Sequence, residues 1–198
     1  MKTIKIKKGE HKSNEWYKLF FGFKIERIYT FTEKSTYNLG DEDQQDWNKL
    51  FGFTSGIFIK FKVLFKTDER IKYCDFKVRV PFSKKWYWCV FMPYHWNSAR
   101  FGCRYNKIDN TYEFDSYVYD NGFRRYDNNF CTHPLNREIV FTISKAKEAY
   151  MFKIKGRYDM RVWRKTVVVN KTKDIGITLP SFFGGNEVAP NDVEYLTK

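Results

Sequence analysis

Apolar and polar residues alternate with a period of two along much of the chain, which is the pattern of half-buried β-strands. In the segment IFIKFKVLFK, from Ile57 to Lys66, the odd-numbered positions are all apolar, and Lys60 and Lys62 lie on the other face with Phe58 and Leu64. Further strand-like segments occur at 72–80, 99–105, 111–119, 138–144, 149–155 and 161–169. The segment 86–91 is apolar on both faces and predicts a central strand. About ten short strands at this spacing predict an all-β sandwich or barrel.

Turn signals separate these segments. Asn121-Gly122 is typical of a type I′ hairpin turn, because both central positions of that turn need a positive φ. A polar link of hairpin length occurs at 107–110, and 155–156 and 170–173 are further turns. We therefore predict a two-sheet antiparallel β-sandwich, a jelly roll, formed by residues 1–198 as a single domain. Its basic N-terminal segment, residues 1–15, is a candidate edge strand.

The end of the chain, LPSFFGGNEVAPNDVEYL, predicts two late strands joined by a glycine-rich loop. The first strand covers 175–181, and the chain then kinks at Gly184-Gly185. A turn at 190–192 leads into the final strand, Val193 to Leu196.

One segment, DEDQQDWNKLFG, predicts a short helix from Asp41 to Phe51. Acidic residues occupy its first turn, Lys49 lies near its end, and Gly52 follows as a stop.

Charge and aromatic content suggest the kind of partner. The chain of 198 residues has 36 Lys and Arg against 23 Asp and Glu, a net charge of +13. This balance favours polyanionic partners, namely nucleic acid, an acidic polysaccharide or an anionic membrane, unless it serves solubility alone. The 20 Phe, 14 Tyr and 6 Trp exceed what a core alone requires, so we expect some of them on a contact surface.

Apolar runs do not reach the length of about 20 residues that a membrane-spanning helix needs. No apolar segment follows the basic N-terminus, so we see no signal peptide and expect a cytoplasmic protein or a virion component. Cys74, Cys89, Cys103 and Cys131 lie far apart without CxxC spacing, which indicates buried free thiols.

Several catalytic chemistries lack their motifs. His11, His95 and His133 are widely separated, and neither a phosphate-binding glycine loop nor a GxSxG elbow occurs. Calcium is the one cofactor left open, because Asp41, Asp43 and Asp46 supply carboxylates, although EF-hand spacing is missing. The alternative is that these acids begin the predicted helix.

The segment PYHWNSARFGCRY, from Pro93 to Tyr105, is the richest in candidate binding residues. Arg offers planar donors to carboxylates, and Trp and Tyr offer flat faces to sugars or bases. Arg100 and Arg104 share one strand face with Gly102 between them, whereas Tyr105 alternates to the other face. The alternative is an aromatic loop that leads into an ordinary outward-facing Arg row.

Three pieces of sequence, HWNSARFG, SYVYDNGFRRY and FFGGN followed by a Pro-Asn-Asp turn, resemble the concanavalin-A-like jelly rolls of glucuronan- and alginate-type polysaccharide lyases. The resemblance covers about Phe51 to Leu196 and extends to uncharacterised proteins of gut anaerobes and their tailed phages. It implies that the final strand returns to pair near the N-terminal strand.

The same resemblance implies candidate roles. In such lyases a Tyr or His moves the proton next to a uronate carboxylate while Arg or Asn neutralises that carboxylate. The catalytic candidates are then Tyr105, His95 and Arg100. The ligand-binding candidates are Trp96, Asn97, Arg100, Arg104 and Tyr117. The catalytic strand motifs of the family are not intact here.

Our leading hypothesis from the sequence is a non-catalytic binding or virion-associated module that contacts acidic polysaccharide, or another polyanion, through a basic aromatic concave face. Self-association or contact with other virion proteins would accompany a structural role. The alternatives are a polysaccharide lyase acting on uronate polymers by β-elimination, and a nucleic-acid-binding protein, since stacking aromatics with Lys and Arg also suit a single strand.

Overall fold

The computed structural model describes residues 1–40, 44, 46–56, 61–64, 76–79, 86–91, 97–126, 130–170, 172–184 and 187–198. For residues 61–64, 76–79, 86–91 and 126 it describes the backbone alone.

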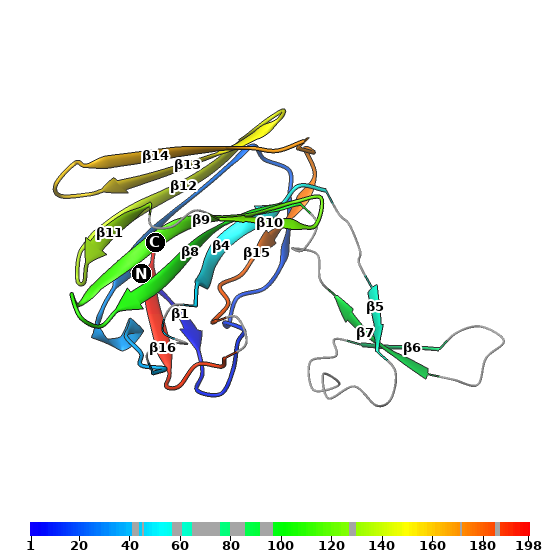
Figure 1. The fold of residues 1–198 in the computed structure, drawn as a ribbon, viewed down its shortest axis with the longest axis horizontal. Coiled ribbons are helices and arrows are strands. Elements are labelled where there is room, and N and C mark those ends of the chain that lie inside the picture. Colours follow the sequence, from blue (N-terminus) through cyan, green and yellow to red (C-terminus); the bar gives the residue numbers. More distant parts are fainter. Residues whose placement is uncertain are drawn as a thin grey trace.

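One large sheet has six strands and contains both ends of the chain (Figure 1). Its order is β1 (Lys2–Ile6), β16 (Val193–Thr197), β3 (Lys24–Phe31), β12 (Glu138–Ala146), β13 (Ala149–Gly156) and β14 (Val162–Val168). Every neighbouring pair is antiparallel. The final strand pairs with β1, with Ile4 opposite Tyr195, as the resemblance implied. β1 lies at the edge of this sheet.

The second large sheet has seven strands, again antiparallel. Its order is β10 (Phe123–Tyr126), β9 (Thr111–Asp120), β8 (Ser98–Asn106), β4 (Asn48–Thr54), β15 (Gly176–Leu179) and β2 (Lys18–Phe20), and β11 (Cys131–Pro134) also pairs with β9. A separate three-stranded sheet has the order β5 (Phe61–Leu64), β7 (Trp86–Phe91) and β6 (Phe76–Arg79).

Aromatic rings fill the space between the two large sheets. Phe101 of β8 lies 4.9 Å from Phe141 of β12 and 5.2 Å from Phe152 of β13, measured between ring centroids. Phe31 of β3 lies 5.2 Å from Phe114 of β9. Because these rings come from facing strands and are buried, the two sheets share one core. The two-sheet antiparallel β-sandwich predicted from the sequence is confirmed.

The turn at the end of β9 also agrees with its sequence. Asn121 and Gly122 have φ values of 50° and 86°, as a type I′ turn requires. The two-residue turn sets the register of the hairpin, in which Phe123 pairs with Asp120 and Arg124 with Tyr119.

The helix predicted from Asp41 to Phe51 is wrong at its C-terminal end, although the described residue Gln44 has a 3₁₀ conformation. Asn48–Thr54 is strand β4, and the helical element found elsewhere in the described residues is a 3₁₀ turn, Glu33–Ser35. Leu50, Phe51 and Phe53 are all fully buried, so burial on both sides of a central strand outweighs the helix-like order of charges. Asp41–Asp43 lie outside the described residues.

Candidate functional site

The two faces of strand β8 carry different kinds of residue. Phe101 and Cys103 point into the core, so Arg100, Gly102 and Arg104 lie on the opposite, outer face of the seven-stranded sheet. The register with β9 runs without a shift, placing Arg100 opposite Tyr117 and Arg104 opposite Glu113. We call this surface of β4, β8, β9 and β10 the outer face.

Tyr117 is the centre of a cationic cluster on the outer face. The Lys49 Nζ atom lies 5.2 Å from the centroid of the Tyr117 ring, and the Arg124 guanidinium carbon lies 5.8 Å from it. Arg124 Nη1 also donates to the Tyr117 hydroxyl at 3.5 Å. The ring of Tyr119 meets that of Tyr117 edge-on, with centroids 5.8 Å apart. Two cations therefore flank one nearly buried phenol beside a second aromatic ring.

Trp47 and Arg104 form a second aromatic and cationic unit on this face. The Arg104 guanidinium carbon lies 4.7 Å from the Trp47 ring centroid, while its Nε donates to Glu113 Oε2 at 2.5 Å. Gly102 makes room for the indole, since a Cβ there would lie 3.2 Å from Trp47 Cε3. The indole is held by these contacts and keeps part of its surface exposed.

Burial and neighbouring charge lower the pKa of Lys49 to about 8. Burial is the main cause, followed by the positive charge of Arg100, and Arg124 acts in the same direction. The ammonium group donates to the carbonyl oxygen of Gly184 at 2.7 Å. An anion that binds here would favour protonation of this amine.

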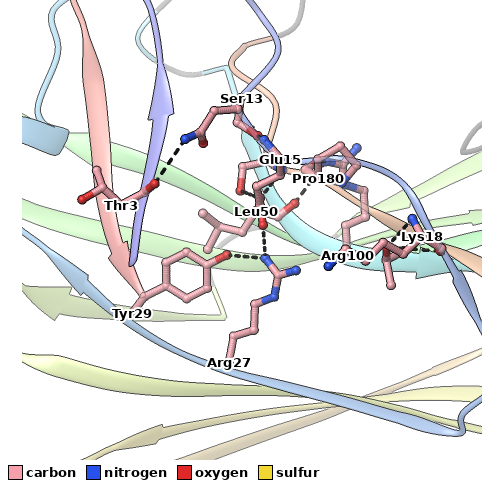
Figure 2. A network of polar contacts seen from close by, with 12 residues as sticks. Thr3, Ser13, Glu15, Lys18, Arg27, Tyr29, Leu50, Arg100 and Pro180 are labelled. Carbon is pink, nitrogen blue, oxygen red and sulfur yellow. Dashed lines mark hydrogen bonds and ion pairs between the residues drawn. The ribbon is translucent and has the colours of Figure 1, made fainter. Parts of the chain in front are cut away.

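Arg100 is only 5% exposed, and its side chain reaches from β8 to the main chain of β4 and of the segment after β15. A β-bulge shifts the register of β4 against β8 between Lys49 and Gly52, and Arg100 Nη2 donates to the Leu50 carbonyl at 3.1 Å. The same nitrogen donates to the Pro180 carbonyl (Figure 2). These main-chain contacts tie β4, β8 and the segment after β15 together.

An ion pair between Glu15 and Arg27 also holds the segment that follows β15 (Figure 2). Arg27 of β3 donates through Nη1 to Glu15 Oε1 at 2.6 Å. The other oxygen of Glu15 accepts from the Ser181 backbone N–H at 3.0 Å and from its hydroxyl at 3.1 Å. The Glu15 side chain is 7% exposed, so this pair links the two sheets in a poorly solvated place. It thereby fixes the Pro180 carbonyl that Arg100 contacts.

The structure groups only some of the residues selected from the sequence. Arg100, Arg104 and Tyr117 share the outer face, whereas Tyr105 points to the core side, where its hydroxyl donates to Asn110 Oδ1 at 2.9 Å. Asn97 lies just before β8 and its Oδ1 accepts from the Asn121 N–H at 2.7 Å. His95 and Trp96 lie outside the described residues.

Four members of the outer-face site were missed in the sequence: Trp47, Lys49, Tyr119 and Arg124. The first two lie in the segment predicted as a helix, which hid their alternation. Arg124 could have been found, because a two-residue turn at Asn121-Gly122 places it opposite Tyr119.

The described part of the chain contains neither a metal-binding group of side chains nor a helix that could span a membrane. There, His, Cys, Asp and Glu form no group of three or more that could hold a metal ion. Asp46 belongs to this part, whereas its fellow calcium candidates Asp41 and Asp43 do not. None of the helices in the same residues is long and apolar enough to cross a membrane.

Comparison with known proteins yields only distant structural likenesses. No protein-family model matches the chain, and no curated protein matches it by sequence. The alginate lyase from Klebsiella pneumoniae is similar at 8% identity and a TM-score of 0.42, over 88% of this chain and 58% of the lyase. The chain therefore spans less than two thirds of that enzyme's length.

The second likeness is to the carbohydrate-binding module CBM66 from Bacillus subtilis. Its identity is 9% and its TM-score 0.31, over 94% of this chain and 83% of the module. At these values neither likeness assigns a ligand or an activity to this chain. They do not bear on a phage or gut-anaerobe source or on virion association, which stay expectations.

Proposed function

We propose that this protein is a non-catalytic binding module that holds an acidic polysaccharide on the outer face of its seven-stranded sheet. The observation that carries the proposal is the placing of Tyr117 between Lys49 and Arg124, with the Trp47–Arg104 unit on the same face.

The chemistry of a uronate polymer suits this arrangement. Each sugar ring has an apolar C–H face that can pack on an aromatic ring, and a carboxylate that a guanidinium can bind through two parallel hydrogen bonds. Trp47 and Tyr119 keep part of their surface exposed, and Arg124 is exposed, so these three are placed to meet the ligand. Arg100 contributes positive charge from below rather than direct contact, since it is almost fully buried.

Retention on immobilised alginate, glucuronan, pectate and hyaluronan tests the proposal, with a neutral β-glucan and single-stranded DNA alongside. We expect binding to at least one acidic polysaccharide and a loss of about tenfold in affinity for Arg124→Gln, the size of one charge-assisted contact. Arg161→Gln is the matched control, because Arg161 is 76% exposed and lies outside the outer face, in the turn before β14. Equal losses in both variants, or a preference for DNA, would contradict the proposal.

Lys49 supports a second candidate, a β-eliminating polysaccharide lyase. An amine whose pKa is about 8 is partly neutral at mildly basic pH, and it lies beside Tyr117 and two Arg residues. In this reading neutral Lys49 takes the proton next to the uronate carboxylate while Arg124 neutralises that carboxylate. The electron pair of that C–H bond forms the C=C bond of the unsaturated sugar, the glycosidic C–O bond breaks, and the departing oxygen takes back the proton from the Lys49 ammonium.

The ultraviolet absorbance of that unsaturated product separates the two candidates. New absorbance that is lost in Lys49→Met but kept in Arg161→Gln would make the chain a lyase. Retention on the polysaccharide without new absorbance supports the binding module.

A further inference from the structure

Large apolar side chains are also exposed at and beside β2, which is two strands from β4 in the seven-stranded sheet. Trp16 is 83% exposed, Leu19 62%, Phe21 69% and Phe23 71%. We call these four residues the aromatic edge. They fall within eight consecutive positions, between the start of the chain and β3.

The aromatic edge follows from the position of β2. This strand is the last in the order of the seven-stranded sheet, and Leu19 pairs with Ile177 of β15. Phe20 turns inward and stacks on Phe53 with ring centroids 4.8 Å apart, so its neighbours Leu19 and Phe21 face away from the core. Phe21 to Phe23 then form the connection to β3 in the other large sheet.

The backbone that carries these side chains is held in place. The Phe23 carbonyl accepts from the Lys145 N–H at 2.8 Å, and Lys18 N–H donates to Thr178 Oγ1 at 2.9 Å. The Lys145 ammonium also lies 5.6 Å from the centroid of the Phe20 ring. The rings are therefore presented to solvent from a supported connection.

The area is large for a surface without a partner. An aromatic side chain has about 150–250 Å² to bury, so Trp16, Phe21 and Phe23, each exposed by more than three fifths, already present several hundred Å². An exposed apolar area of this size is as large as the largest apolar patches of typical monomeric proteins, and such patches often bind a partner.

The aromatic edge could be covered by a second copy of the chain or by an anionic bilayer, and the charge around it favours the bilayer. No acidic residue occurs from Trp16 to Lys24, and Glu15 is buried against Arg27. Lys18 is exposed within this run, and Lys24 at its end is about half exposed while it contacts Glu26 at 3.0 Å. A second copy would bring another chain of net charge +13 against these lysines. An anionic bilayer accepts aromatic rings at the boundary of its headgroups and attracts the lysines.

We propose that the aromatic edge inserts into the surface of an anionic bilayer, so that the module binds a membrane peripherally. Trp16, Phe21 and Phe23 enter the interfacial region, and Lys18 and Lys24 contact lipid phosphates. The outer face lies over β4, β8, β9 and β10, and β15 stands between β4 and β2, so the two proposed ligands contact different strands of the sheet.

Co-sedimentation of the full chain with lipid vesicles tests this. Vesicles of phosphatidylcholine with phosphatidylglycerol are compared with vesicles of phosphatidylcholine alone. We expect stronger binding to the anionic vesicles, with a blue shift of tryptophan emission that is reduced in Trp16→Phe. The double variant Phe21→Ser/Phe23→Ser should bind at least about tenfold more weakly, and Lys18→Gln several-fold more weakly.

Phe123→Ser is the matched control. Phe123 is 76% exposed on β10, at the opposite end of the strand order from β2, so its vesicle binding should equal that of the unaltered chain. Arg124→Gln should also keep vesicle binding, which separates this test from that of the polysaccharide site. If the double variant fails to show cooperative thermal unfolding, Trp16→Ser replaces it.

Two results would overturn the proposal. One is equal vesicle binding by the double variant and Phe123→Ser. The other is a concentration-dependent dimer in analytical ultracentrifugation that the double variant abolishes, which would make the aromatic edge a contact between copies.

Discussion

Gly52 of β4 and Arg100 of β8 are register partners, and the arginine side chain occupies the space where a Cβ at position 52 would stand. That Cβ would lie 2.6 Å from Arg100 Cγ and 2.1 Å from the Ala99 carbonyl oxygen. The absence of a side chain at Gly52 lets Arg100 cross to the carbonyls of Leu50 and Pro180. The site above depends on this close approach.

Gly52→Ala should therefore lower the free energy of unfolding by about 3 kcal/mol or more. The neighbouring oxygen is backbone in a central strand, so the strain cannot be relieved by rotating a side chain. Chemical denaturation followed by far-UV circular dichroism measures the loss.

Gly102→Ala provides the contrast on the same face. Its Cβ would meet the Trp47 ring at 3.2 Å, and a side chain can shift by a few tenths of an ångström. We expect less than about 1 kcal/mol of lost stability, together with weaker polysaccharide binding because the indole moves. A loss of stability equal to that of Gly52→Ala would contradict this account.

The Glu15–Arg27 pair should contribute more to stability than pairs at the surface. Glu15→Gln leaves Arg27, whose side chain is 24% exposed, without its carboxylate partner in the sandwich. We expect a loss of about 2–3 kcal/mol, below the full value for a buried pair because Arg27 keeps some solvent. Urea unfolding measures it.

Arg161→Gln is the comparison for that experiment, since Arg161 contacts Asp159 at 3.9 Å and is 76% exposed. Its loss should not exceed about 0.5 kcal/mol. If Glu15→Gln costs no more than Arg161→Gln, the ion pair does not hold the sheets together as we infer.

The lowered pKa of Lys49 predicts that the folded protein becomes more stable as pH rises. Its pKa is about 8 in the folded chain against an ordinary value of 10.5, so between these values the unfolded chain holds a proton that the folded chain has released. Stability therefore increases as pH rises from about 8 toward 10.5, and the burial cost is fully present below pH 8.

We expect this gain to be about 1–2 kcal/mol, because solvent reaches part of Lys49 and screens its charge. It is measured as the difference in unfolding free energy between the unaltered chain and Lys49→Met at several pH values, so that other titrating groups cancel. A difference that does not change with pH would show that Lys49 keeps an ordinary pKa.

Cys103 should resist alkylation in the folded protein. Burial raises its pKa to about 12, so neither thiolate nor access is available at neutral pH. Iodoacetamide followed by peptide mass spectrometry should modify Cys103 only after denaturation. Rapid labelling without denaturant would mean that β8 opens far more readily than its central position implies.

The buried-thiol prediction itself is confirmed for two cysteines. Cys103 and Cys131 are free and buried. Cys74 lies outside the described residues, and the side chain of Cys89 does as well, so for these two it stays a prediction.

The local alternation of apolar and polar residues was sufficient to predict the β-sandwich. Alternation along 99–105, 111–119 and 149–155 marks strands because a two-residue period leaves one face apolar whatever the partner strand is. The Asn121-Gly122 turn was equally readable, since few other residues adopt positive φ at low cost. These features lie within a few neighbouring residues, and sequence alone determined them.

The place of each strand within its sheet could not be predicted from the local sequence. The segment DEDQQDWNKLFG has acids at its start and Lys49 near its end, as a helix often has. Its last residues nevertheless belong to the central strand β4, because Leu50, Phe51 and Phe53 are buried between neighbours distant in sequence. Tertiary structure alone therefore brought Trp47 and Lys49 beside Arg104 and Tyr117, since their contacts cross three strands. It also decided that β2 ends the sheet, which leaves Phe21 and Phe23 in solvent rather than in a core.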